Sequence, residues 1–373
     1  MRKTYKFRMF PTKAQRTKLN QTLETCRQVY NSTLGSRKQA WEVEQKSLSL
    51  YDTNKVLTGW KAANPELSEV HSQVLQNVQE RVDLAFKAFF RRVKAGEKNG
   101  FPRFKGHGRY DSFTFKQSGF ELFVNGKLRL SKIGSIKIKL HRPIEGIIKT
   151  LTVRRDSLGN WYACFSCEIE PKPLPHVEWA VGIDLGLTTF LTLSNSATIA
   201  NPRFFRKEEK ALAKAQRKLS KQTNGTPERA KAKKVVAHIH NRIANKRRDF
   251  AHQTSRVLVN QYGFIAFEDL NINGMIHNHH LAKSIADAAW NQLVQFSSYK
   301  AEEAGRVMVQ VDPRNTTKMC SRCGMLVDKT LSERVHKCSH CSLEMNRDLN
   351  ASINILRIGL DSIGLKSVEA PSL

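Results

Sequence analysis

The sequence predicts an α+β multidomain protein: a small antiparallel sheet or barrel with a helical insert, then an α/β domain that carries a zinc ribbon. Three observations support this fold class. Alternating strand patterns flank a long helical pattern in the first half of the chain. Short apolar strands that end in carboxylates follow after residue 179. Two Cys-x-x-Cys pairs lie near the C-terminus and indicate a metal-bound module.

Length and charge restrict the class of protein. The chain has 373 residues, which suggests two or three domains, and 40% of them are apolar. A net charge of +29 would strain a compact fold unless a polyanion neutralised it, so nucleic acid is the expected partner and a membrane surface the weaker alternative. The sequence contains no apolar run of membrane-spanning length and no signal-peptide core, and its seven cysteines suit a reducing compartment. We therefore expect a soluble, cytoplasmic protein.

The first domain is predicted to be a barrel that a helical segment interrupts. Thr4 to Phe10 alternates like a strand, and a helical pattern runs from Lys13 to about Lys94. We interpret Phe86 and its aromatic neighbours as core residues in preference to base-stacking residues. The basic residues that follow them are expected to form a solvated rim of the helical bundle. The further expected strands are Ser112 to Phe115, Leu122 to Val124, Lys127 to Leu130, Ile136 to Leu140, Ile147 to Arg155 and Trp161 to Glu170. The barrel is thus assigned to residues 1–11 and 96–172, and the helical insert to 12–95.

The second domain, assigned to residues 173–313 and 344–360, contains three acids in distinctive positions. Asp184 ends a short apolar strand, Glu268 ends another, and Asp348 opens an amphipathic helix. A buried acid is costly unless it is paired or bound to a metal. Three such carboxylates fit a site for two Mg²⁺ ions, which prefer oxygen ligands. The alternative is that one Asp caps a turn while the other acids lie on the surface.

The same domain contains a strongly basic helical segment. Arg203 to Asp249 holds sixteen Lys and Arg residues against four acids, and Asn224-Gly-Thr-Pro227 divides it into two helices. A solvated helix usually mixes charges of both signs, so this segment is expected to lie along phosphates. His238 and His240 would point in different directions on a helix, and we do not assign them to a metal site. The same domain should continue with a helix from Ile285 to Glu303.

Four cysteines define a zinc ribbon at residues 314–343. Cys320 and Cys323 are separated by fourteen residues from Cys338 and Cys341, which is the spacing of paired zinc knuckles. Four thiolates leave no open coordination position, so one structural Zn²⁺ is expected. Cys164 and Cys167 should face opposite sides of a strand, and we interpret them as packing residues. Residues 361–373 are expected to form a flexible tail.

Motifs along nearly the whole chain resemble those of the transposon-encoded TnpB (OrfB) proteins, relatives of the type V CRISPR effectors. The motifs are Thr4-Tyr-Lys-Phe-Arg-Met-Phe-Pro11, Phe101-Pro-Arg-Phe-Lys105, Gly182-Ile-Asp-Leu-Gly186, Phe267-Glu-Asp-Leu270, Ile285-Ala-Asp-Ala-Ala-Trp290, Val311-Asp-Pro-Arg-Asn-Thr-Thr-Lys-Met-Cys320 and Asn346-Arg-Asp-Leu-Asn350. The resemblance implies a wedge-type β-barrel with a helical recognition insert, then an RNase H-like (RuvC) domain with an inserted zinc ribbon.

The resemblance also implies an activity. It implies that Asp184, Glu268 and Asp348 are the Mg²⁺-binding catalytic acids of an RNA-guided endonuclease encoded by an insertion sequence. It implies a guide RNA from the transposon end, cleavage of double-stranded DNA beside a short transposon-associated motif, and a place near the bacterial nucleoid. Tyr51 and Gln76 match the motif-reading positions loosely. Two departures from the family pattern, Asn346 for Asp and Ser342 for Gly, remove no ligand.

Three rival functions remain. An actin-like ATPase would share the Gly-Ile-Asp-Leu-Gly motif but would need a second phosphate loop, which the sequence lacks. A nuclease-inactive, RNA-guided DNA-binding repressor would have lost catalytic acids, whereas all three are present. A transposase would need a nucleophile beside a histidine pair on a strand, and His238 and His240 do not provide that pair.

Overall fold

The computed structural model describes residues 1–330 and 333–365, and the chain divides into two compact units, Met1–Ile169 and Glu170–Leu373. We call these the N-terminal and C-terminal units and describe each by itself. The barrel, insert and ribbon boundaries predicted within them stay predictions. The predicted tail falls partly on residues 366–373, which lie outside the described residues, while Asp361 and Ser362 are the last residues of a helix.

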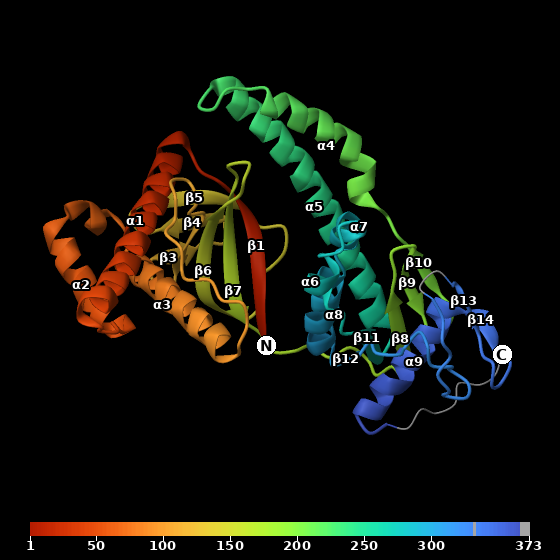
Figure 1. Cartoon of the computed structure of the whole chain (residues 1–373). Helices are drawn as coiled ribbons and strands as arrows, with labels where there is room; N and C mark the ends of the chain where they lie inside the picture. The colour runs from red at the N-terminus through yellow and green to blue at the C-terminus, as the bar shows by residue number, and fades with distance from the viewer. Residues whose placement is uncertain (331–332, 366–373) are drawn as a thin grey trace. The chain divides into compact units, whose positions relative to one another are not determined.

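A seven-stranded antiparallel sheet forms the core of the N-terminal unit, with the strand order β2-β6-β7-β1-β5-β4-β3 (Figure 1). The strands are β1 (Arg2–Phe10), β2 (Ser112–Phe115), β3 (Phe120–Leu122), β4 (Lys127–Leu130), β5 (Gly134–Lys139), β6 (Ile147–Arg155) and β7 (Trp161–Glu168). The rings of Phe115 and Phe120, on the two edge strands, lie 6.2 Å apart. The sheet is therefore a nearly closed barrel whose edges meet through side chains, not through a hydrogen-bonded ladder.

Three long helices lie between β1 and β2 in the chain: α1 (Lys13–Glu44), α2 (Leu50–Ala63) and α3 (Ser72–Lys94), with a 3₁₀ helix (Pro65–Glu69) before α3. Thr12 and Ser49 cap α1 and α2 through capping boxes. Val74, Leu75, Val78 and Val82 recur at helical spacing, and they are buried in the same core as Phe7 and Phe165 of the sheet.

The predicted bounds of β1, β5 and β7 differ from the observed ones by one or two residues at an end, whereas one predicted strand is displaced as a whole by two residues. The prediction placed it at Leu122 to Val124, whereas β3 ends at Leu122 and Val124 is fully exposed. The reason is the turn, because the N–H of Gly126 donates to the carbonyl of Phe123 and the N–H of Phe123 to that of Lys127. Residues 123–126 are used for the reversal of the chain and cannot extend the strand.

The C-terminal unit is built on a five-stranded sheet with the order β10-β9-β8-β11-β12 (Figure 1). Its strands are β8 (Ala180–Leu185), β9 (Thr189–Leu193), β10 (Thr198–Ala200), β11 (Phe264–Glu268) and β12 (Val307–Val311). β8, β11 and β12 are parallel, whereas β9 is antiparallel to β8 and to β10. Parallel strands need crossover connections, and helices provide them here.

Helices cover both faces of this sheet. They are α4 (Phe204–Ser220), α5 (Pro227–Gln261), α6 (Ile272–Met275), α7 (Ala282–Ala288), α8 (Trp290–Ala304) and α9 (Arg347–Ser362). α5 and α8 pack on Val181, Ile183 and Ile265, while α9 packs on Phe264 and Ala266. Side chains alternate between the faces of a strand, so α9 lies on the face opposite α5 and α8.

The predicted helix from Ile285 to Glu303 is wrong in one respect, because it is two helices. Ala289 adopts a left-handed conformation, with φ of 55°, and separates α7 from α8. Asp287 before the break accepts a hydrogen bond from the N–H of Phe205, and Trp290 after it is buried in the sheet core. These two anchors give each helix its own direction. No described helix is both long enough and apolar enough to cross a membrane.

Candidate active site and metal cluster

The register of two parallel strands sets Asp184 beside Glu268. In the ladder between β8 and β11, Gly182 pairs with Ala266 and Ile183 with Phe267, so Asp184 and Glu268 are the next residues of the two strands. Because strand side chains alternate, both acids share the sheet face of Gly182 and Ala266. Both acids are buried, with 8% and 6% of their surface exposed. The parallel strands thus place two carboxylates at one edge of the sheet.

Small residues on this face let α9 lie directly on the sheet. A Cβ atom on Gly182 would come within 2.1 Å of the carbonyl oxygen of Ser352, and one on Gly359 within 2.7 Å of Ala266. Gly359, near the end of α9, thus lies toward the start of β11, and the helix runs antiparallel to the strand. The first turn of α9 is therefore directed toward Asp184 and Glu268.

Asp348 lies in that first turn. The side chain of Asn346 caps the helix by accepting hydrogen bonds from the N–H groups of Asp348 and Leu349, at 2.8 and 3.2 Å. The Arg347 guanidinium donates to one carboxylate oxygen of Asp348 through two nitrogens, each at 3.1 Å. The departure from the family pattern at Asn346 therefore supplies a helix cap.

Electrostatics show that the three acids share one environment. Burial raises the pKa of Asp184 well above its usual range, and the charges of Glu268 and Asp348 raise it further. Burial also raises the pKa of Glu268, with a further increase from Asp348 and an opposing decrease from a hydrogen bond to Thr316. Two buried acids and a half-buried third repel one another here, and a bound cation would relieve that repulsion.

Thr316 is a contact of this site that the sequence analysis missed. Its hydroxyl donates to Glu268 Oε1 at 2.5 Å, and its side chain is almost fully buried. Asn354 of α9 donates to the carbonyls of Thr316 and Met319 at 2.8 and 2.6 Å. The only sequence signal for Thr316 is its place in the segment between β12 and Cys320, and nothing in its spacing points to Glu268.

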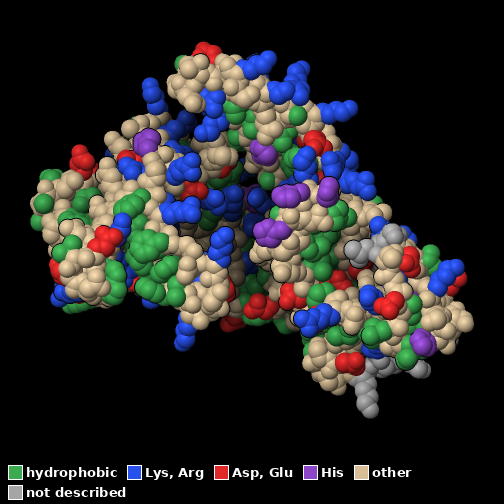
Figure 2. All heavy atoms as spheres, in the orientation of Figure 1, with side chains coloured by type: hydrophobic (Ala, Val, Ile, Leu, Met, Phe, Trp, Pro, Cys, Tyr) green, Lys and Arg blue, Asp and Glu red, His purple; other side chains and the backbone are tan. Residues whose placement is uncertain are grey.

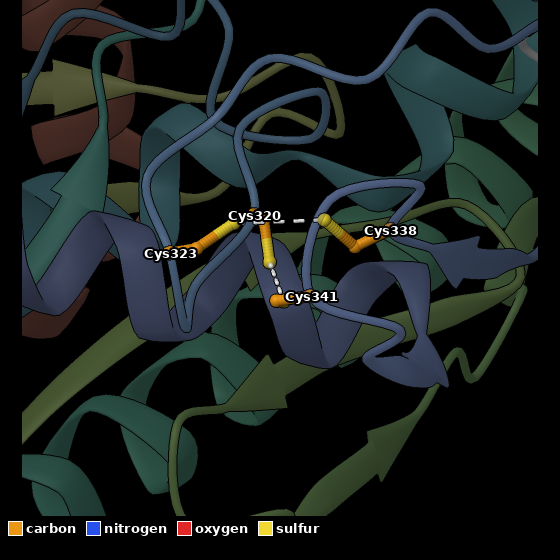
Figure 3. A group of neighbouring side chains, drawn as sticks. All are labelled: Cys320, Cys323, Cys338 and Cys341. Carbon is orange, nitrogen blue, oxygen red and sulfur yellow. Dashed lines mark hydrogen bonds between the residues drawn. The ribbon is translucent and has the colours of Figure 1, made fainter.

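Four cysteines form the second cluster, with their sulfurs converging from two loops (Figure 3). Among residues 1–330 and 333–365, they are the one group whose candidate metal-ligating atoms all lie within 4.8 Å of one another. The sulfurs of Cys320 and Cys341 are 3.6 Å apart, as are those of Cys323 and Cys338. Four ligands at about 2.3 Å from a tetrahedral Zn²⁺ would be roughly 3.8 Å apart, so the set fits zinc. The three acids do not form so tight a group.

The cysteine cluster is joined to α9 by hydrogen bonds. Asn350 donates to the carbonyl of Met319 at 2.7 Å and accepts from the N–H of Ser321 at 2.9 Å, on both sides of Cys320. A two-stranded sheet, β13 (Val335–Lys337) with β14 (Glu344–Asn346), leads from the cluster into α9. The helix that carries Asp348 is thus fixed to the cysteine cluster at its N-terminal half.

Basic side chains gather over α4 and α5 (Figure 2). Asp287 ties these helices to α7, because it accepts from the N–H of Phe205 at 2.8 Å and from Arg247 at 2.7 Å. His238 and His240 lie on α5, outside the one metal-ligating group found in the described residues. Tyr51 and Gln76 are exposed on α2 and α3, and their predicted role in motif reading stays a prediction.

Family models match three parts of the chain. Residues 164–279 match OrfB_IS605, described as "Probable transposase", and residues 290–355 match "Cas12f1-like, TNB domain". A "Putative RNA-guided DNA endonuclease" of Streptomyces pristinaespiralis is 36% identical over 368 residues, which cover 96% of this chain and 90% of that protein. The chain belongs to the OrfB (TnpB) family. The two matched spans contain all three acids and all four cysteines.

Other OrfB relatives agree with this assignment. "Putative RNA-guided DNA endonuclease InsQ" of Escherichia coli is 28% identical, over 95% of this chain and 92% of that protein. The "CRISPR-associated endodeoxyribonuclease Cas12f1" of Sulfoacidibacillus thermotolerans is 26% identical over 70% and 67%. A solved Cas12f1–sgRNA–target DNA complex resembles the fold with a TM-score of 0.57 and 16% identity, over 90% of this chain and 81% of that one.

One family description differs from the observed structure. Residues 1–46 match an OrfB_IS605 "Helix-turn-helix domain". In the structure these residues form the strand β1 and the single long helix α1, and β1 pairs with β5 and β7 in the sheet. The N-terminal segment of this OrfB protein is therefore part of the barrel and its first helix.

Proposed function

We propose that the chain is an RNA-guided DNA endonuclease, encoded by an insertion sequence, that cuts double-stranded DNA beside a short transposon-associated motif. The observation that carries the proposal is that Asp184 and Glu268 lie side by side at one edge of the sheet, and that Asp348 lies close enough for its charge to raise the pKa of both. The relatives named as RNA-guided endonucleases support it, because the similarity extends over nearly the whole chain.

The C-terminal unit would be the nuclease domain, with an RNase H-like (RuvC) fold. Its strand order supports this, since numbering its strands along the chain gives 3-2-1-4-5, with the first three antiparallel and the last two parallel to the first. In such open sheets ligands bind beyond the carboxyl ends of the strands. Asp184 and Glu268 lie at the carboxyl ends of the two central parallel strands.

The acids suit Mg²⁺, since all three supply carboxylate oxygens, the ligands that this cation prefers. When bound, a pair of such ions activates water and stabilises the departing oxygen of a phosphodiester. Asp184, Glu268 and Asp348 would hold the ions. The hydroxyl of Thr316 would keep Glu268 oriented, and the zinc-bound cysteines would fix α9.

The basic surface supports the proposed nucleic-acid partners. A guide RNA and its hybrid with DNA are dense in negative charge, which a chain of net charge +29 would neutralise. Base pairing would read the target sequence, so the protein needs to contact mainly shape and backbone. α4 and α5 offer such contacts (Figure 2), and Tyr51 and Gln76 are the proposed readers of the adjacent motif.

The test is to purify the protein from cells that carry its native flanking DNA, sequence the RNA that copurifies, and challenge the complex with a matching plasmid and Mg²⁺. We expect a discrete RNA and a cut plasmid. Asp184→Asn should abolish cutting and keep binding. Asp269, an exposed acid next to Glu268, offers a matched control, because Asp269→Asn should keep both. Binding without cutting by the unaltered protein would support the repressor, and absence of a discrete RNA would refute guidance.

A further inference from the structure

The N-terminal unit has a cavity of about 500 Å³ between the end of α1 and the second half of α3. We call it the aromatic pocket. Its aromatic lining consists of Trp41, Phe86, Phe89, Phe90 and Phe101. A cavity of this size and composition is typical of sites that accept small or flat ligands. None of the residues of the proposed nuclease site or of the cysteine cluster lines it.

The aromatic rings of the pocket differ in how far they are exposed to solvent. Phe86 packs against the core of the unit, and Phe101 meets Phe86 and Phe89 edge-on, with ring centres 5.4 and 5.6 Å apart. In contrast, Trp41, Phe90 and Phe101 expose 54%, 59% and 47% of their surfaces. The sequence-based interpretation as core residues therefore holds for Phe86 but is wrong for Phe90. Grouped exposed aromatic rings indicate a binding surface.

Charge around the aromatic pocket favours an anionic occupant. The lining itself is nearly balanced in charge. Arg37, whose guanidinium lies 4.9 Å from the centre of the Phe86 ring, pairs with Asp83 at 3.0 Å, and Lys38 pairs with Glu42 at 3.5 Å, so the excess of positive charge comes from the chain that follows Phe90. The segment from the end of α3 through Lys105 adds six cations against the single acid Glu97, and most of them are exposed: Arg91, Arg92, Lys94, Lys98, Arg103 and Lys105. A second copy of this chain would bring like charge to the same surface. A phosphate backbone would bring opposite charge, and its bases would bring flat faces.

We propose that the aromatic pocket binds unpaired bases of an RNA strand by stacking, while the surrounding cations contact its phosphates. Bases expose their faces only when they are unpaired, and stacking on protein aromatic rings is tolerant of sequence. The choice of RNA over DNA rests on the proposed function, in which guide RNA stays bound before and during the encounter with DNA. The pocket itself does not depend on the three acids.

The test measures binding of the full chain to a short unstructured RNA and to an abasic RNA of the same length, across a range of salt concentrations. The abasic strand keeps the phosphates and loses the bases, so the affinity ratio isolates stacking. We expect the protein to prefer the RNA with bases by about tenfold. Phe90→Leu, which stays apolar but cannot stack, should remove most of that preference without changing the salt slope. Lys94→Ala should reduce the slope by about one and keep the preference.

Controls separate stacking from folding. Phe90→Tyr should retain the preference, and Leu84→Ala, at an exposed apolar position of the same helix, should leave it unchanged. Equal affinity of the unaltered protein for the two RNAs, or a full preference in Phe90→Leu, would overturn the proposal. A larger preference with DNA strands would overturn the choice of RNA. This test measures binding and not cutting. If the protein prefers the RNA with bases but lacks guided nuclease activity, the proposed function is refuted and the proposal for the aromatic pocket stands.

Discussion

Asp184 is the residue on which the proposed chemistry depends, and the fold is destabilised by its charge. Its pKa is raised by burial and by the charges of Glu268 and Asp348, so the folded state binds a proton more tightly than the unfolded state does. Stability contributed by the protonated form is therefore lost as the pH rises from the unfolded pKa through the folded pKa. Without a cation, this site should weaken the fold at neutral pH.

The first prediction concerns the stability that the fold loses by burying the charge of Asp184. Asp184→Asn removes the charge at nearly constant shape, so it should raise the melting temperature at neutral pH in the presence of a chelator, by about 2–4 °C for each kcal/mol gained. The gain should shrink as the pH falls toward the usual pKa of an aspartate, because the unaltered acid is then protonated. Thermal melts at several pH values would measure it. A lower melting temperature for the variant at neutral pH would show that Asp184 is satisfied without a cation.

The second prediction concerns Thr316 as a positioning residue for Glu268. Its hydrogen bond lowers the pKa of Glu268 against the increase from burial, so Thr316→Val should raise that pKa further. If cutting needs the ionised carboxylate, the acid limb of the pH–rate profile should move to higher pH, with about a tenfold lower rate at neutral pH. Thr316→Ser keeps the hydroxyl and should retain the original profile. An unshifted profile in Thr316→Val would exclude the proposed role.

At the scale of elements, the close packing of α9 on β8 brings Asp348 to the strand acids. Gly182 is required there because its missing Cβ is where the backbone of α9 passes. Loss of this approach would move the first turn of the helix away from Asp184. The geometry of the site is thus decided as much by a residue without a side chain as by the acids themselves.

The third prediction tests that packing. In Gly182→Ala, the new Cβ would meet backbone atoms of Ser352 and Leu356 at 2.1 and 2.4 Å, so the helix must shift or the unit must unfold. We expect a loss of at least about 1–3 kcal/mol in stability and loss of cutting. The matched control is Gly59→Ala in α2, where the added Cβ meets nothing within 4 Å. That control should be neutral or stabilising in the same denaturant titration.

Much of the element structure could be predicted from the sequence, because periodicity reports burial. β2, β4 and β6 have the predicted bounds, and the strands that carry Asp184 and Glu268 lie where the apolar runs placed them. The break at Ala289 could not be predicted, since alanine favours continuous helix and the anchors on either side of it, Asp287 and Trp290, make tertiary contacts that no local pattern reports. Thr316 and Asn354 were missed because their partners are remote in sequence and no spacing links them.

At the scale of the whole molecule, charge should dominate association with nucleic acid. The fourth prediction is that the affinity of the protein for its RNA falls steeply with salt, with a log–log slope of magnitude near the number of phosphates contacted. Neutralising pairs of exposed lysines on α5, such as Lys233 and Lys234, should reduce the slope, while Asp184→Asn should not. Binding curves at several salt concentrations would measure it. A slope near zero would contradict an electrostatic role for the +29 charge.

The central claim is that acids from two strands and one helix form one divalent-metal site, and metal binding itself tests this most directly. Titration of the purified protein with Mn²⁺, followed by electron paramagnetic resonance, counts bound ions without requiring a guide RNA or a substrate. We predict that binding is lost or greatly weakened in Asp184→Asn, Glu268→Gln and Asp348→Asn and is unchanged in Asp269→Asn. Equal Mn²⁺ binding by the unaltered protein and the three acid variants would contradict the account.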